Sequence, residues 1–191
     1  MEGVLTPEVW IAVAERTKIP ELRRTTRDEP DYDKLMRYRI DLLDRHAITL
    51  SRIQEVIATL PLLPGALDFL NELRRRTQVI VLSDTFEQFA QPLLRQMGWP
   101  TLFCHRLIVE EDRITGYRLR MPDQKRASVA ALQSLNYNVI AAGDSFNDTS
   151  MLGQADQGFL FHAPENVVRQ FPQFPAVYDF PELLALIIAR L

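Results

Sequence analysis

The hydrophobic pattern of the chain changes near residue 60. From residue 7 to about residue 59 apolar positions recur every three or four residues, which predicts helices with breaks near 19–20 and 28–31. After the segment P-L-L-P-G at 61–65, helical patterns alternate with short continuous apolar runs. Such runs are typical of strands that are buried on both faces of a parallel sheet. The pattern therefore predicts an α/β fold in which helices cover both faces of a parallel sheet.

The second part of the chain predicts a regular series of elements. In chain order they are a helix at 65–76, a strand at 78–83, a helix at 86–97, a strand at 102–109, a hairpin at 113–119, a helix at 125–135, a strand at 139–143, a helix at 147–153, a strand at 157–161, a short helix near 165–170 and a helix at 181–190. The hairpin is indicated by I-T-G-Y between alternating positions. We expect three units: a short first segment at 1–6, a helical block at 7–60 and an α/β core at 61–191.

Two carboxylates follow the apolar run that ends at Gly143. They are Asp144 and Asp148, and they lie where a predicted strand gives way to a helix. In parallel sheets ligands bind beyond the carboxyl ends of the strands, and acids beside helix-end amides suit a divalent cation and a phosphoryl group. The alternative is a solvated turn in which Asp144, Ser145 or Asn147 caps the next helix. An EF-hand is excluded, because its ligands need alternate positions and a distal glutamate.

Three further segments carry reactive side chains close to predicted element ends. They contribute Glu2 near the start, the trio Ser83, Asp84 and Thr85 after the first strand, and Lys125 at the start of a helix. Each has a simpler explanation, since Thr85 with Gln88 fits a helix capping box and Lys125 could be an ordinary surface cation. Together they place an acid, a hydroxyl, a lysine and an acid pair in one chain order, which favours a single site.

At these residues the sequence resembles the haloacid dehalogenase superfamily of phosphotransferases. The likeness is greatest to bacterial phosphoserine phosphatases, in particular to the group that also transfers the phosphoryl group to homoserine. It covers essentially the whole chain and includes E-G-V-L at 2–5, S-D-T-F at 83–86, F-H-A-P-E-N-V at 161–167 and F-P-Q-F-P-A-V at 171–177. The resemblance implies a Rossmann-like core with a helical cap inserted near the N-terminus. It also implies a cytoplasmic enzyme of serine biosynthesis.

The start of the chain departs from the pattern of that superfamily. The pattern is D-x-D/E-G, in which the first aspartate attacks phosphorus; Glu2 matches the second acid and Met1 occupies the x. The nucleophile and the central strand that carries it are therefore expected to be missing. Removing that strand leaves a slot about 10 Å wide, and each buried unpaired backbone group costs roughly 1–3 kcal/mol against a total stability of roughly 5–15 kcal/mol. We expect such a chain to fold poorly and to be inactive.

This departure has two interpretations. A start site placed too far downstream, or a trimmed chain, is favoured over a genuinely inactive relative, because the other motif residues are all in place. Glu2 is not expected to replace the nucleophile, since backbone next to a chain terminus is usually poorly anchored.

The resemblance also implies a mechanism. It is magnesium-dependent phosphoryl transfer through an aspartyl-phosphate, with Mg²⁺ held by the missing aspartate, the backbone carbonyl of Glu2 and the carboxylate of Asp144. Glu2 would protonate the leaving oxygen and then activate water or homoserine. Ser83 and Lys125 would bind the phosphoryl oxygens, and Asp148 would orient Lys125 or a metal-bound water. Asp84, Thr85 and Asn147 would lie beside the substrate.

One arginine can be singled out from helical phase alone. In the predicted helix at 31–46, Arg39 lies at the centre of the apolar stripe and Arg37 lies on the opposite side. A buried guanidinium needs an anionic partner, which could be an acid of the helical block or a ligand carboxylate, unless the side chain reaches to the rim. The resemblance matches Arg39 to a substrate-binding arginine and Glu8 to the glutamate that meets the substrate amine. The spacing from Glu2 to Glu8 is one residue shorter than in many relatives.

Composition adds exclusions. The net charge of −3 gives no support for nucleic acid or an anionic membrane surface as a partner. No run approaches 18 apolar residues and the N-terminus has no signal-peptide pattern, so we expect no membrane association. Cys104 is expected to be a packed thiol in a reducing cytosol. The three histidines, His46, His105 and His162, lack metal-ligand spacing and are interpreted as structural.

Three rival functions remain open. A receiver domain also uses acids, a hydroxyl and a lysine at strand ends, but it lacks a helical block of this size. A phosphatase acting on another small phosphate ester is disfavoured by Glu8 and Arg39. A binding protein that holds an amino acid phosphate without turnover follows directly from the missing nucleophile.

Overall fold

The helical first part predicted from the sequence is present in the computed structural model, which describes residues 1–25, 28–29 and 31–191. Its helices are α1 (Val9–Thr17), the 3₁₀ turn η1 (Pro20–Arg23), α2 (Tyr32–Arg45) and α3 (Leu50–Ala58). Asp31 caps α2 and Thr49 caps α3 through side-chain oxygens that accept backbone N–H groups. Of the predicted break at 28–31, residue 30 lies outside the described residues.

The α/β part follows the predicted order. Its elements are α4 (Ala66–Arg74), β1 (Ile80–Phe86), α5 (Glu87–Gln96), β2 (Thr101–Glu110), β3 (Arg113–Arg118), α6 (Gln124–Ser134), β4 (Ile140–Gly143), η2 (Phe146–Asp148), α7 (Thr149–Gln154), β5 (Gln157–Phe161), α8 (Glu165–Gln170), β6 (Ala176–Val177) and α9 (Phe180–Ile188). Three predictions were wrong in detail. β1 continues three residues past 83, and the predicted helix at 147–153 is divided into η2 and α7. The residues I-T-G-Y, predicted to be a hairpin turn, lie inside β3, and the hairpin turns at residues 111–112 between β2 and β3. The two-residue strand β6 was not predicted.

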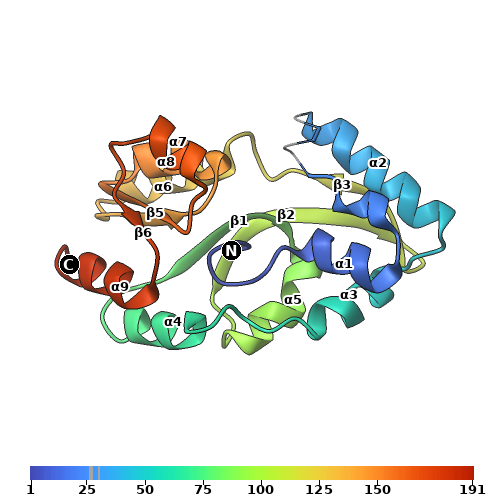
Figure 1. Cartoon of the computed structure of the whole chain (residues 1–191), viewed down its shortest axis with the longest axis horizontal. Helices are drawn as coiled ribbons and strands as arrows, with labels where there is room; N and C mark the ends of the chain where they lie inside the picture. The colour runs from blue at the N-terminus through green and yellow to red at the C-terminus, as the bar shows by residue number, and fades with distance from the viewer. Residues whose placement is uncertain (26–27, 30) are drawn as a thin grey trace.

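The strands form two sheets, which are separated where the central strand was expected to be missing (Figure 1). β1 runs parallel to β2, which pairs antiparallel with β3, whereas β4, β5 and β6 are all parallel. Among the described residues no hydrogen-bonded ladder joins β1 to β4. Between them lies a cavity of about 540 Å³, which we call the slot, lined by both strands. A ladder requires strands roughly 4.8 Å apart, so the slot explains why the sheet is divided.

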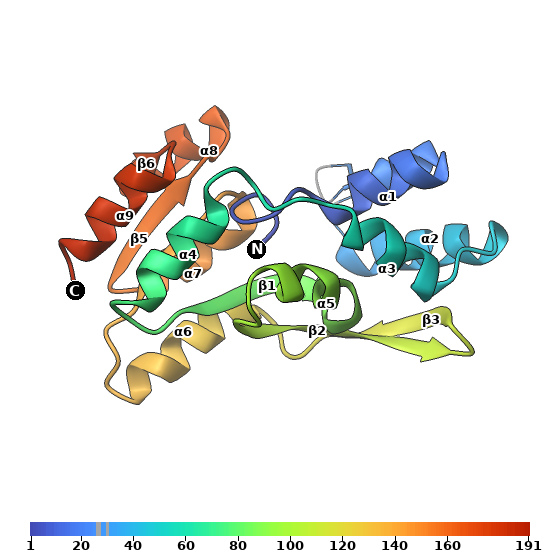
Figure 2. The same ribbon diagram turned by 90° about the horizontal axis from the view of Figure 1, so that it is seen from below.

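Helices hold the two sheets together where the backbone does not. α4 packs against α9, and α6 packs against both β1 and α7 (Figures 1 and 2). Phe180 of α9 stacks between Phe69 of α4 and Phe161 of β5, with ring centroids 4.9 and 4.7 Å apart. Side-chain packing on one face therefore replaces the missing ladder.

The helical block is fixed over β1 by aromatic packing and by the β2–β3 hairpin. Trp10 of α1 meets Phe89 of α5 edge to face, with centroids 5.4 Å apart. On the hairpin, the Tyr117 hydroxyl donates to Asp33 of α2 at 2.7 Å. The Leu50 N–H at the start of α3 donates to the Asp112 carbonyl at 2.8 Å. Both ends of the block are thereby tied to the first sheet.

The proposed capping box of Thr85 and Gln88 is wrong. β1 runs on to Phe86, which is the N-cap residue of α5 and makes no side-chain cap. The amide of Gln88 instead binds the backbone of Leu107 in both directions, at 2.9 Å to its carbonyl and 3.0 Å from its N–H. Gln88 thus anchors α5 to β2.

Two expectations from composition can be compared with the structure. Cys104 is buried, and burial raises the pKa of its thiol to about 11, as expected for a packed core cysteine. Within the described part of the chain, no helix has the length and apolarity needed to span a bilayer.

Replacing Leu93 by Ala should destabilise the fold strongly. Leu93 is fully buried on α5, which packs against α3, so its loss leaves a cavity where the helical block meets the core. We expect the free energy of unfolding to fall by about 2–5 kcal/mol in urea titrations. Leu67→Ala on α4, where Leu67 is 39% exposed, should change it by roughly 1 kcal/mol or less. Similar losses for both variants would contradict this packing.

Candidate active site

All ten residues singled out from the sequence line one cavity. This cavity has a volume of about 400 Å³ and lies where the carboxyl ends of β1 and β4 meet the helical block. Its lining includes Glu2, Glu8, Arg39, Ser83, Asp84, Thr85, Lys125, Asp144, Asn147 and Asp148. The roles of these residues remain predictions, but their convergence from five separate segments is a property of the structure. We call this cavity the polar cavity, to distinguish it from the slot.

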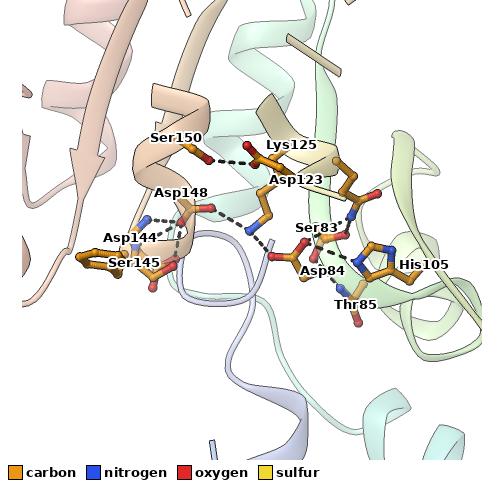
Figure 3. A network of polar contacts seen from close by, with 12 residues as sticks. Ser83, Asp84, Thr85, His105, Asp123, Lys125, Asp144, Ser145, Asp148 and Ser150 are labelled. Atoms are coloured by element: carbon orange, nitrogen blue, oxygen red, sulfur yellow. Dashed lines mark hydrogen bonds and ion pairs between the residues drawn. The ribbon is translucent and has the colours of Figure 1, made fainter. Parts of the chain in front are cut away.

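The ammonium of Lys125 lies at the centre of the polar network (Figure 3). Its Nζ is 2.8 Å from Asp84 Oδ2 and 2.8 Å from Asp148 Oδ1, and the side chain is almost fully buried. Burial lowers the pKa of this ammonium, but Asp148 and Asp84 outweigh that effect and raise the pKa above its usual value. Lys125 is therefore a fixed positive charge rather than the surface cation of the alternative interpretation.

Asp148 uses both carboxylate oxygens. One oxygen receives Lys125, and the other accepts the Asp144 N–H at 3.0 Å, the Ser145 N–H at 3.2 Å and the Ser145 hydroxyl at 3.1 Å. Burial opposes ionisation, but Lys125 keeps the pKa of Asp148 below its usual range. A Cβ at Gly143 would collide with this side chain, so the strand must end in glycine. Asp148 thus completes a capping box and also positions the lysine.

Asp144 lacks such compensation. Burial, followed by the charge of Asp148, raises the pKa of its carboxyl to about 6. The carboxylate lies against Gly3, where any Cβ would collide with it. Among the described residues it forms no ion pair with a lysine, arginine or histidine. A half-buried carboxylate without an ion-pair partner favours a bound cation.

A metal ion would need donors besides acidic side chains. Among the described residues, no three His, Cys, Asp or Glu side chains are grouped so as to hold a metal. Asp144 offers one carboxylate oxygen, and backbone carbonyls or water would have to complete an octahedral shell.

Glu2 is anchored, contrary to the expectation for a residue next to a chain terminus. Its Oε2 accepts the Val9 N–H at 3.0 Å, and the Gly3 N–H donates to the Thr6 carbonyl at 2.9 Å. This turn closes by its own backbone hydrogen bonds, which the terminal position alone did not indicate. Burial raises the pKa of Glu2 above its usual value, and the hydrogen bond from Val9 opposes this shift.

The end of β1 is held from two sides. Ser83 is buried, and its hydroxyl accepts the Thr85 N–H at 3.3 Å while its carbonyl accepts Gln124 Nε2 at 2.5 Å. The Asp84 carboxylate lies against Lys125 and His105 (Figure 3). Gln124 was not predicted from the sequence and His105 was interpreted only as structural, because nothing in their local patterns indicates what they contact in the fold.

Arg39 is buried in α2, as its helical phase predicted. Its guanidinium donates to the Arg24 carbonyl at 2.7 Å and lies over the Trp10 ring, 4.4 Å from the centroid. Burial lowers its pKa to about 10, and its Nε has no hydrogen-bond partner. No ion pair to Arg39 is found within the described residues, so the internal salt-bridge alternative has no support there. Glu8 lines the same cavity and is exposed.

The sequence matches known proteins over most of its length. Residues 3–156 match the family model for haloacid dehalogenase-like hydrolases. The chain is 61% identical over 184 residues to a phosphoserine phosphatase of Pseudomonas syringae pv. tomato, covering 96% of this chain and 78% of that protein. It is 60% identical over 184 residues to the phosphoserine phosphatase ThrH of Pseudomonas aeruginosa, covering 96% and 90%.

Solved structures share the fold. A substrate-bound phosphoserine phosphatase complex superposes with a TM-score of 0.78 at 20% identity, covering 96% of this chain and 92% of that one. A phospho-aspartyl intermediate analogue of phosphoserine phosphatase superposes with a TM-score of 0.76 at 19% identity, covering 96% and 93%. At these identities the likeness is evidence for the fold alone.

Replacing Asp144 by Asn should stabilise the chain above pH 6 when divalent cations are chelated. The folded state raises the pKa of this carboxyl from 3.8 to about 6, so it binds the proton more tightly than the unfolded chain does. Its contribution to stability is therefore present below about pH 4 and is lost as pH rises to about 6. We expect the neutral amide of the Asp144→Asn variant to remove this loss, worth about 1–3 kcal/mol at pH 8.

The measurement is the difference in unfolding free energy between variant and parent from pH 4 to pH 8. Asp41→Asn, at an exposed position of α2, is the control for the loss of a surface carboxylate. A difference for Asp144→Asn that does not vary with pH would contradict the half-buried carboxyl with a raised pKa.

Proposed function

Because the chain belongs to the haloacid dehalogenase-like hydrolase family, we propose that its polar cavity binds phosphoserine and supports transfer of the phosphoryl group to water, with homoserine as a second acceptor. The observation that best supports this substrate is the lining of the cavity. It joins the ammonium of Lys125 to the guanidinium of Arg39, a buried arginine without a carboxylate partner among the described residues. The similarity to phosphoserine phosphatases over 96% of the chain supports the same substrate.

The phosphoryl group would lie beside Ser83 and Lys125. The Ser83 hydroxyl and the Lys125 ammonium both line the polar cavity, and the lysine is held in place by two carboxylates. Fixed donors of this kind stabilise the charge that collects on the equatorial phosphoryl oxygens during transfer. Asn147 lines the same cavity and is proposed to contact the substrate.

The amino acid head would lie beside Arg39 and Glu8. Arg39 can offer its Nε to the substrate carboxylate, since that donor has no partner. Glu8 can accept hydrogen bonds from the substrate ammonium. A zwitterion gives each side chain a partner of opposite charge, and an ester without an amino acid head leaves Arg39 unpaired.

Glu2 is proposed as the general acid and base. Its raised pKa allows it to protonate the leaving serine oxygen and then to take a proton from water or from the homoserine hydroxyl. The Val9 N–H, which donates to Glu2 Oε2 at 3.0 Å, holds the carboxyl in place.

We propose Mg²⁺ as the cofactor. The residues present fit it, because Asp144 has a half-buried carboxylate that forms no ion pair with a side chain among the described residues, in a cradle that a Cβ on Gly3 would fill. Asp144 and the backbone carbonyl of Glu2 would hold the ion, together with an aspartate in the position before Met1. When bound, Mg²⁺ supplies charge neutralisation to the phosphoryl oxygens.

The nucleophile is proposed to be an aspartate that this polypeptide does not contain. Met1 stands immediately before Glu2, and the slot between β1 and β4 reaches Met1 at its polar end. An apolar strand that ends in aspartate just before Met1 would fill the slot and bring its carboxylate to the polar cavity. The helical block at 7–60 would then act as the cap over this site.

We also propose that the enzyme acts in the cytoplasm.

The polypeptide of 191 residues should bind phosphoserine but not hydrolyse it. Binding is measured by calorimetry in magnesium buffer, and turnover by release of inorganic phosphate. A chain extended by an apolar strand ending in Asp before Met1 should hydrolyse phosphoserine, and the same extension ending in Asn should not. Magnesium-dependent turnover by the unextended polypeptide would refute our assignment of the nucleophile.

In the extended chain, Arg39→Ala should lower kcat/KM for phosphoserine by at least about 30-fold. Loss of a desolvated charged pair costs about 2–5 kcal/mol. Hydrolysis of p-nitrophenyl phosphate, which has no amino acid head, should change far less. Arg37→Ala, on the exposed side of α2 and paired with Asp33, is the matched control and should leave both reactions nearly unchanged. Equal losses for both substrates would show that Arg39 is structural.

A further inference from the structure

The end of β1 leaves the regular ladder where it carries its polar residues. Leu82 pairs with Phe103 of β2, and Phe86 pairs with His105, so four steps along β1 correspond to two along β2. The residues 83–85 therefore form a bulge that is not held by regular strand pairing. Bulges of this kind redirect side chains, and here the redirected side chain is that of Asp84.

Side chains hold this bulge in place of the ladder. Gln124 donates to the Ser83 carbonyl at 2.5 Å and approaches Asp84 Oδ1 at 3.4 Å. The Tyr32 hydroxyl reaches the Asp84 carbonyl at 3.5 Å. On the side of β2, Nε2 of the buried His105 lies 3.6 Å from Asp84 Oδ1 (Figure 3).

The hydrogen bond of the second ring nitrogen determines which nitrogen of a neutral His105 ring carries the proton. Its Nδ1 accepts the Arg120 N–H at 3.2 Å, so a neutral ring carries its proton on Nε2. That N–H is directed at the Asp84 carboxylate. At 3.6 Å the contact is longer than a good hydrogen bond, and its main effect is electrostatic. Burial raises the pKa of Asp84, but His105, followed by Lys125, lowers it well below its usual range.

We propose that His105 is a positioning residue: it fixes the Asp84 carboxylate and, through it, the Lys125 ammonium that binds the phosphoryl group. Oδ1 of Asp84 faces His105 and Gln124, which leaves Oδ2 directed at Lys125 at 2.8 Å. This role rests on the proposed function. It also reassigns Asp84 from a direct substrate contact to a support of the lysine.

The consequence concerns where the lysine lies. With Asp84 fixed, Lys125 is shared between Asp84 on β1 and Asp148 next to β4. Without the ring N–H, the Asp84 carboxylate can rotate away, and the ammonium is drawn towards Asp148. The phosphoryl group then loses a donor at the position where its charge develops.

The experiment compares binding by the 191-residue polypeptide in magnesium buffer, measured by calorimetry. His105→Leu fills space without a donor and should weaken phosphoserine binding about 5- to 10-fold. His105→Gln, whose amide N–H can take the place of Nε2–H, should bind within about twofold of the parent. If the Leu variant does not fold, His105→Asn, which is too short to reach Asp84, supplies the comparison. Equal binding by the donor-free variant and the parent would overturn the proposal.

A double-mutant cycle separates positioning from a merely structural role. In an Asp84→Asn background, His105→Leu should have little further effect on phosphoserine binding, because the partner through which it acts is already altered. Additive losses would show that His105 only fills space. A parent polypeptide that binds L-serine and phosphoserine equally would contradict the proposed function instead, since its phosphoryl end would then contribute nothing.

Discussion

The Lys125 ammonium joins the two sheets at their polar ends. No ladder connects β1 to β4 in the described part of the chain, yet Asp84 at the end of β1 and Asp148 beyond the end of β4 both lie 2.8 Å from the same Nζ. Lys125 and Asp148 are buried and Asp84 is partly exposed, and burying a charge costs several kcal/mol unless it is paired and hydrogen-bonded. Asp148 meets that condition through the 144–145 backbone, and Asp84 through its neighbours on α6 and β2. The arrangement fixes the position of the lysine more than it adds to stability.

The other charged residues of the site are those that this lysine and its two carboxylates leave without an ion-pair partner. Lys125 is already shared by two carboxylates and offsets the charge of Asp144 only in part, so burial raises the pKa of that carboxyl. Glu2 is partly buried, and its pKa is raised as well. Across the cavity Arg39 carries a positive charge without an anionic side-chain partner among the described residues. Its guanidinium lies over the Trp10 ring, and its Nε has no hydrogen-bond partner. A cation near Asp144 would neutralise the acidic side of the cavity. The carboxylate of a zwitterionic phosphate ester that spans the cavity would pair with Arg39.

Much of this could be predicted from the sequence because strand ends and helical phase are local properties. The acids after Gly143 were placed beyond a strand end by an apolar run alone, and the burial of Arg39 followed from the phase of α2. The hydroxyls after Leu82 were predicted at the end of a strand that continues to Phe86. The bulge at 83–85 was not predicted, because it exists only in the pairing of β1 with β2. For the same reason the partners of Asp84 on α6 and β2 were missed. β6 was missed since two residues carry no period.

The most direct test of the account is a crystal structure of the chain with phosphoserine and Mg²⁺. The account predicts the phosphoryl group within hydrogen-bond distance of Ser83 and Lys125, the substrate carboxylate on Arg39 and its ammonium beside Glu8. It also predicts that Lys125 keeps its contacts to Asp84 and Asp148. A ligand whose carboxylate lies away from Arg39, or whose phosphoryl group lies away from Lys125, would contradict it.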